Sequence, residues 1–175
     1  LAAGFVFSAR ASWAQLAPPN QMGVSMCHLH LSTPDADASQ QFWLMLGGTA
    51  AKHGVAPIVK LPGVLIAFAK REPSGSTEGS IVDHVGFVAR NGLELLKKVQ
   101  AANGRVTMDA KSHGGYFYSP EGVKVEITEN SSLSTPVAFD YIQLLAAEPA
   151  SVAEMQAWYV KTFGAKNGVA ADGTQ

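Results

Sequence analysis

A pattern that occurs three times constrains the fold of this chain more than any other feature of the sequence. Each occurrence is a short strand, a turn, an amphipathic helix and a terminating glycine, and the predicted strands span 26–31, 82–88 and 139–144. His28, His84 and Tyr141 hold the same position in these strands, 56 and 57 residues apart. Equal spacing of this kind is typical of repeated supersecondary units that bury their apolar faces on one another. The chain is therefore predicted to consist of modules.

The segments after each strand have the apolar spacing of amphipathic helices. The predicted helices span 37–46, 93–102 and 151–163. Asp37 is the expected N-cap of the first helix, and Ser151 with Glu154 forms a potential capping box at the start of the third. Gly164 is expected to end the third helix, because glycine readily adopts the left-handed conformation of a helix C-terminus.

Further strands follow the first two helices but not the third. The runs suited to strands are 56–60 and 64–70 in the first repeat, and 105–108, 115–118 and 123–128 in the second. We therefore predict an α+β fold of repeated βαβββ modules, in which one strand of the first module is poorly marked. The predicted divisions are 1–23 as leader and linker, 24–130 as two paired modules (about 24–72 and 80–130), and 137–175 as the start of a further module, truncated in this chain.

Composition excludes several classes of protein. The net charge of −1 and the lack of a basic stripe give no electrostatic support for nucleic-acid binding. Cys27 is the only cysteine of the 175 residues, so neither an internal disulfide nor a CxxC zinc site can form. Any metal ion must therefore be held by His, Asp or Glu. After the first residues, no apolar stretch approaches the roughly 20 residues of a membrane-spanning helix.

The beginning of the chain suggests export. Residues 1–7 are apolar, and Ser12-Trp13-Ala14 resembles the small-x-small pattern of a signal-peptidase site. This interpretation predicts a secreted or periplasmic protein. The alternative is a disordered leader or a tag remnant on a cytoplasmic protein.

Side-chain alternation places chemically active residues on one face of the predicted strands. His28 and His30 share a face of the first strand, His84 takes the same position in the second repeat, and Glu126 shares a face with Lys124 in 123–128. Two imidazoles and a carboxylate are the ligands of the two-His-one-carboxylate metal site. A single strand histidine is more often an ordinary core or surface residue. The matched position in two repeats is what favours a metal site.

Three motifs carry a resemblance to a known superfamily. They are Cys27–Leu31 (CHLHL), Asp83–Phe87 (DHVGF) and Tyr118–Glu126 (YSPEGVKVE). In order and spacing they resemble the vicinal oxygen chelate superfamily, which includes glyoxalase I, fosfomycin-resistance proteins, extradiol dioxygenases and bleomycin-resistance proteins. The resemblance covers about 24–130. It implies two modules whose sheets form a cup around one divalent ion (Fe, Mn, Zn or Ni), with His28, His84 and Glu126 as the ligands.

The chain also departs from particular members of this superfamily. The fourth, carboxylate ligand of glyoxalase I has no counterpart in Gly63–Ala69, which favours the three-ligand members. Tyr116 stands ten residues before Glu126, as in extradiol dioxygenases, but the histidine of that pattern is missing from 107–109. His30, His113 and Tyr116 are the candidate catalytic residues near the mouth of the cup.

The resulting hypothesis is a metal-dependent enzyme that polarises a small substrate with vicinal oxygens. The alternatives are a ring-cleaving dioxygenase of the extradiol type and a non-catalytic protein that sequesters a small ligand, such as an antibiotic, in the same cup. Besides the small molecule, the expected partner is either a second copy of the chain or C-terminal sequence missing from it, because the apolar faces within 137–175 need a packing surface.

Overall fold

The computed structural model describes residues 18–166, so the predicted signal peptide and the last nine residues lie outside the described part. The elements in chain order are β1 (His28–Thr33), α1 (Ala36–Met45), β2 (Thr49–His53), β3 (Ala56–Leu61), β4 (Val64–Lys70), β5 (Val82–Ala89), α2 (Gly92–Ala101), β6 (Val106–Asp109), β7 (Gly114–Tyr118), β8 (Lys124–Glu129), β9 (Val137–Leu144) and α3 (Ala150–Phe163). Each predicted strand and helix is present, with ends shifted by at most two residues. The strand that the sequence marked poorly is β2.

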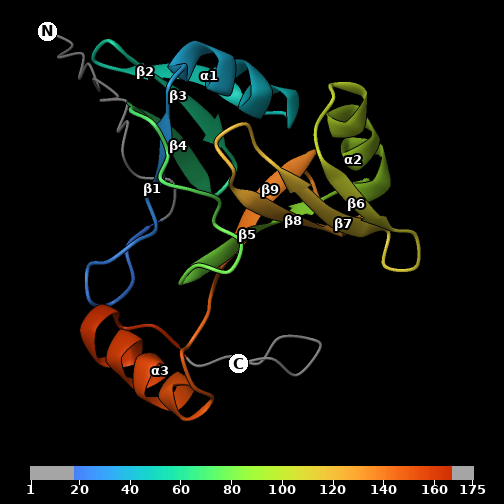
Figure 1. The fold of residues 1–175 in the computed structure, drawn as a ribbon. Helices are drawn as coiled ribbons and strands as arrows, with labels where there is room; N and C mark the ends of the chain where they lie inside the picture. Colours follow the sequence, from blue (N-terminus) through green and yellow to red (C-terminus); the bar gives the residue numbers. More distant parts are fainter. Residues whose placement is uncertain (1–17, 167–175) are drawn as a thin grey trace, which may run out of the picture.

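The strands form two mixed sheets, each built on the same plan (Figure 1). The first sheet has the order β2-β3-β4-β1 and the second has the order β6-β7-β8-β5-β9. In both modules the first strand pairs in parallel with the last strand, as β1 does with β4 and β5 with β8. The other strands pair antiparallel. The predicted α+β fold of repeated βαβββ modules is confirmed.

Strand β9, the first strand of the third repeat, extends the second sheet. It pairs antiparallel with β5, with Tyr141 opposite Gly86 and a register shift between Gly86 and Phe87. Its other contacts reach the first sheet, where the Phe139 amide donates to the Pro62 carbonyl at 2.8 Å. The corresponding edge of the first sheet differs, because within residues 18–166 β1 pairs with β4 alone. The free side of β5 is therefore covered by the third repeat.

The apolar faces of both sheets and of α1 and α2 share one core. Trp43 of α1 and Phe87 of β5 lie 6.1 Å apart between ring centroids, and Phe42 lies 5.8 Å from Phe117 of β7. Trp43, Phe87 and Phe117 are almost completely buried. Because burial of large apolar surfaces is the main favourable contribution to folding, this core fixes the two modules against each other.

The helix ends differ in part from those predicted. Asp35, not Asp37, is the N-cap of α1, and its carboxylate accepts from the amides of Asp37 and Ala38 at 3.1 and 3.0 Å. Pro149 is the N-cap of α3 and no side chain caps this end, so the predicted capping box of Ser151 and Glu154 is wrong. Proline presets the φ of a helical residue, and α3 begins one residue earlier than predicted. Gly164 ends α3 in the left-handed conformation, as predicted.

Helix α3 lies apart from both sheets (Figure 1). Its contacts with the beginning of the described chain include the Asn20 amide, which donates to the Phe163 carbonyl at 2.7 Å. None of its described side chains is buried, and Trp158 is 53% exposed. The apolar face of this helix therefore remains largely in contact with solvent.

No helix within residues 18–166 is both long and apolar enough to cross a membrane.

Candidate functional site

A cluster of polar side chains lies on one face of the second sheet. The alternation of β5 turns Val85 and Phe87 into the core and leaves His84 and Gly86 on the opposite face. Strand β8 follows the same rule: Val125 is buried with the core, and Glu126 lies on the polar face. Parallel pairing places Glu126 opposite Gly86. The site is therefore a direct consequence of two neighbouring strands in a fixed register.

Asp83 anchors the ring of His84. Its carboxylate oxygen Oδ1 lies 2.7 Å from His84 Nδ1 and accepts from Lys124 Nζ at 3.1 Å, while Oδ2 accepts from the Gly79 amide at 3.0 Å. The Gly79 amide, then His84 and Lys124, hold the pKa of Asp83 well below its ordinary value of 3.8. An ionised Asp83 accepts the proton of His84 Nδ1, which leaves Nε2 facing the site.

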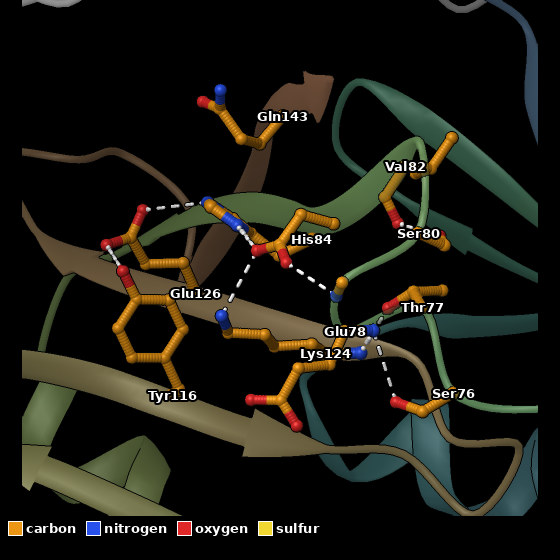
Figure 2. A network of polar contacts seen from close by, with 12 residues as sticks. Ser76, Thr77, Glu78, Ser80, Val82, His84, Tyr116, Lys124, Glu126 and Gln143 are labelled. Carbon is orange, nitrogen blue, oxygen red and sulfur yellow. Dashed lines mark hydrogen bonds and ion pairs between the residues drawn. The ribbon is translucent and has the colours of Figure 1, made fainter. Parts of the chain in front are cut away.

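Glu126 stands between His84 and Tyr116 (Figure 2), and Tyr141 contacts the same carboxylate. Tyr116 donates to its Oε1 at 2.7 Å, Tyr141 donates to its Oε2, and His84 Nε2 lies 3.6 Å from Oε2. Burial, followed by the hydrogen bond to Glu126, raises the pKa of both phenols above the ordinary value. Both tyrosines are therefore neutral hydrogen-bond donors at physiological pH, and together they fix the carboxylate.

Tyr141 reaches this cluster across Gly86. Its hydroxyl lies 3.2 Å from His84 Nε2, and its ring meets the imidazole edge-on with centroids 5.7 Å apart. A Cβ atom on Gly86 would lie 2.2 Å from the Tyr141 ring, far inside van der Waals contact. Glycine at position 86 thus provides the space in which Tyr141 lies.

Lys124 is the positive charge of the cluster. Its ammonium group bonds to Asp83 and lies 4.9 Å from the centroid of the Tyr116 ring. Figure 2 shows its side chain running toward His84 from β8. The charge of Lys124 offsets that of one of the two nearby carboxylates, Asp83 and Glu126. The polar face therefore carries both positive and negative groups.

The structure brings together some of the sequence-predicted site residues and not others. His84, Glu126 and Tyr116 are in contact, whereas His28 and His30 lie exposed on β1 in the other sheet, with ring centroids 4.6 Å apart. His113 directly precedes β7, and its Nδ1 lies 3.1 Å from Glu129 Oε1. Within residues 18–166, no three His, Cys, Asp or Glu side chains are grouped so that they could hold a metal ion. The ligand and catalytic roles stay predictions.

Asp83, Lys124 and Tyr141 belong to this cluster but were not among the predicted site residues. Tyr141 had a usable signal, because it stands at the repeat position of His28 and His84. Lys124 has the same strand parity as Glu126, and Asp83 directly precedes His84. The pairing of β9 with β5, which brings Tyr141 in, has no signal in the local sequence.

Comparison with solved structures identifies the fold. A candidate dioxygenase from Bacillus subtilis superposes on 75% of this chain and 53% of its own length, with 18% sequence identity and a TM-score of 0.52. The two proteins share the same fold. A candidate glyoxalase from Bacillus halodurans covers 60% of this chain and 95% of its own length, with 16% identity and a TM-score of 0.47. An integron cassette protein of Vibrio cholerae covers 62% of this chain and 96% of its own length, with 18% identity and a TM-score of 0.45.

At these identities the likeness is one of fold. No protein-family model matches the sequence, and no curated protein matches it. The chain spans about half the length of the B. subtilis protein that it matches. The fold therefore accounts for the position of the polar face, and the chemistry must be argued from the residues on it.

Proposed function

We propose that this chain is an enzyme that acts on a small substrate with vicinal oxygens, assisted by one divalent metal ion on the polar face of the second sheet. The observation that carries the proposal is the arrangement of His84, whose Nδ1 is bonded to Asp83 and whose Nε2 faces Glu126 at 3.6 Å. Metal-ligating histidines generally donate their other ring N–H to a carboxylate or carbonyl. This imidazole has that arrangement.

The donor atoms fit such an ion in kind. An imidazole nitrogen and a carboxylate suit Fe, Mn, Zn or Ni, and His84 and Glu126 would hold it. His28, the third ligand that the resemblance implies, lies on the other sheet and is not among these donors. When bound, the ion would supply the Lewis acidity that polarises two neighbouring oxygens and stabilises an oxyanion as it develops.

The other residues of the cluster orient the two proposed ligands and bring a positive charge to the site. Tyr116 and Tyr141 hold the two oxygens of Glu126 in place, and Asp83 fixes the orientation of the His84 ring. Lys124 brings a positive charge to this face, where it would attract an anionic oxygen of a substrate. Preorganised donors of this kind need no rearrangement as charge develops, which is the largest contribution of many enzymes to catalysis.

One contact favours a second candidate function. Tyr116 stands ten residues before Glu126, and its hydroxyl donates to that carboxylate at 2.7 Å. A tyrosine at this spacing belongs to the extradiol dioxygenase pattern, so ring cleavage of a catechol-type substrate is the alternative reaction. The non-catalytic alternative, sequestration of a small ligand on the same face, remains distinct because it needs no metal ion.

Metal titration of the purified chain tests the proposal. The wild type is expected to bind one equivalent of Mn²⁺ or Fe²⁺, and His84→Ala to lose most of this binding. Asp83→Asn should weaken it about 10- to 100-fold, as loss of a carboxylate behind a ligating histidine does. His53→Ala is the matched control, because His53 is an exposed histidine on β2. A wild type that binds no divalent ion would exclude the metal-dependent enzyme in favour of the sequestering protein.

A further inference from the structure

Three donor atoms from three different strands meet in the polar cluster, and one of them is a phenol. We propose that Tyr141 is the third metal ligand of this site, in the place that the sequence assigned to His28. This inference rests on the proposed function, and it changes both the ligand set and the repeats that build it. The site would belong to the second and third repeats, with the first repeat contributing no ligand.

The distances support a common site for the three atoms. Tyr141 Oη lies 3.2 Å from His84 Nε2 and is hydrogen-bonded directly to Glu126 Oε2. His84 Nε2 and Glu126 Oε2 are 3.6 Å apart. Because metal–nitrogen and metal–oxygen bonds are about 2.0–2.2 Å long, neighbouring ligand atoms on one ion lie roughly 3 Å apart. Small adjustments would therefore let all three atoms bind one ion.

Tyr141 occupies the same position in its repeat as His28 and His84 do in theirs. Its strand, β9, pairs antiparallel with β5, which carries His84. The first strand that lies beside β5 is thus β9 of the third repeat, and not β1 of the first repeat. His28, in contrast, is exposed, and its Nδ1 lies 3.1 Å from the Cys27 sulfur.

The second repeat also contains a space for the tyrosine ring. Position 86 is glycine, and a Cβ atom there would collide with three ring atoms of Tyr141 at 2.2–2.6 Å. The equivalent residue of the first repeat is His30, whose side chain would fill this space. Gly86 therefore admits the Tyr141 ring against the backbone of β5.

A ligand set of one imidazole, one carboxylate and one phenol selects its ion by hardness. It is harder and more anionic than two imidazoles with a carboxylate, so exchanging an imidazole for a phenolate shifts the preference of the site toward the hard ferric ion. On binding, the Tyr141 O–H bond breaks, its oxygen forms the bond to the metal, and the proton passes to solvent. Because one proton is released per ion, affinity should rise with pH.

Absorption spectroscopy with ferric ion, supplied as a soluble nitrilotriacetate complex, tests the ligand directly. A phenolate bound to ferric iron gives a visible charge-transfer band that imidazole and carboxylate ligands do not produce. The wild type should show this band and Tyr141→Phe should lose it. Tyr116→Phe is the matched control: it removes the other phenol on Glu126, which no hydrogen bond joins to His84, and should keep the band. Persistence of the band in Tyr141→Phe would overturn the proposal.

Two further variants separate this inference from the proposed function. Tyr141→His would complete a set of two imidazoles and a carboxylate, and is expected to bind Co²⁺ at least as tightly as the wild type, without the ferric band. His28→Ala should bind ions like the wild type. If His28→Ala instead loses the metal, the inference fails and the metal-dependent function stands. If the wild type binds neither ferric ion nor Co²⁺, both fail. Circular dichroism of each variant checks that the fold is retained.

Discussion

Strands β1 and β5 begin equivalent modules and carry equivalent histidines, yet their surroundings differ. On β5, His84 is 9% exposed and contacts Asp83, Glu126 and Tyr141. On β1, His28 is exposed and contacts its neighbours Cys27 and His30. The two strands have the same partner on one side, the last strand of their own module. They differ on the other side, where β9 covers β5.

This difference shows what a repeat does and does not determine. The repeat fixes the position of a residue along its strand and the face on which it lies. The neighbouring strand determines whether that residue becomes part of a polar network. For β5 that neighbour comes from the third repeat, which brings in Tyr141 and partly buries the face.

The largest expected difference between the two strands lies in their apolar residues. Phe87 is 1% exposed, and Leu31, its equivalent in the first repeat, is only partly buried. Phe87→Ala should lower the free energy of unfolding by about 3–5 kcal/mol, and Leu31→Ala by roughly 1–2 kcal/mol, because a cavity costs most where the surroundings cannot collapse. Denaturant unfolding measures both. Equal losses would mean that β1 is buried to the same extent in solution.

Asp83, which holds the His84 ring, should make a contribution to the free energy of unfolding that depends on pH. Asp83 has a pKa lowered below 3.8 in the folded chain, so it contributes stability above the unfolded-state pKa, and this contribution is lost as the pH falls through the folded-state pKa. Asp83→Asn should therefore cost about 1.5–3 kcal/mol at neutral pH and progressively less below about pH 4. Cys27, the equivalent residue of the first repeat, has no carboxylate, and Cys27→Ala should show no such pH dependence. Unfolding curves from pH 2 to 7 compare the two, and parallel curves for both variants would contradict the role of Asp83.

The smallest expected effect concerns the space beside His84. Gly86→Ala should destabilise the chain by about 1–3 kcal/mol, because the added methyl group meets the Tyr141 ring. His30→Ala, at the equivalent position of β1, should change the free energy of unfolding by less than about 0.5 kcal/mol. The same unfolding assay measures both. If Gly86→Ala is neutral, Tyr141 does not lie over β5 in solution.

Much of the fold could be predicted because periodicity is local. The alternation of Val85, Gly86 and Phe87 marks β5 without any tertiary information. Strand β2 was poorly marked in the sequence because Thr49–His53 is mostly exposed and shows no apolar alternation. The N-cap of α1 was misplaced by two residues because Asp35 and Asp37 are both good caps, and the backbone geometry selects Asp35.

Only the part of the candidate site that lies within the second module could be predicted from the sequence. His84, Glu126 and Tyr116 lie on strands of one module, so repeat position and strand parity bring them to one face. Tyr141 joins them through a pairing between modules. His28 stays apart for the same reason, since no pattern within 26–31 specifies which strand lies beside it. Long-range strand order is thus the part of the site that periodicity did not determine.

We propose that a metal ion binds beside His84 and not beside His28. A titration with paramagnetic Mn²⁺, followed through the ring-proton NMR signals of the five histidines, tests it most directly. We expect the His84 signals to broaden at the lowest Mn²⁺ concentration, while the signals of the other four histidines (His28, His30, His53 and His113) remain sharp. Simultaneous broadening of His28 and His84, or broadening of His28 and His30 alone, would contradict it.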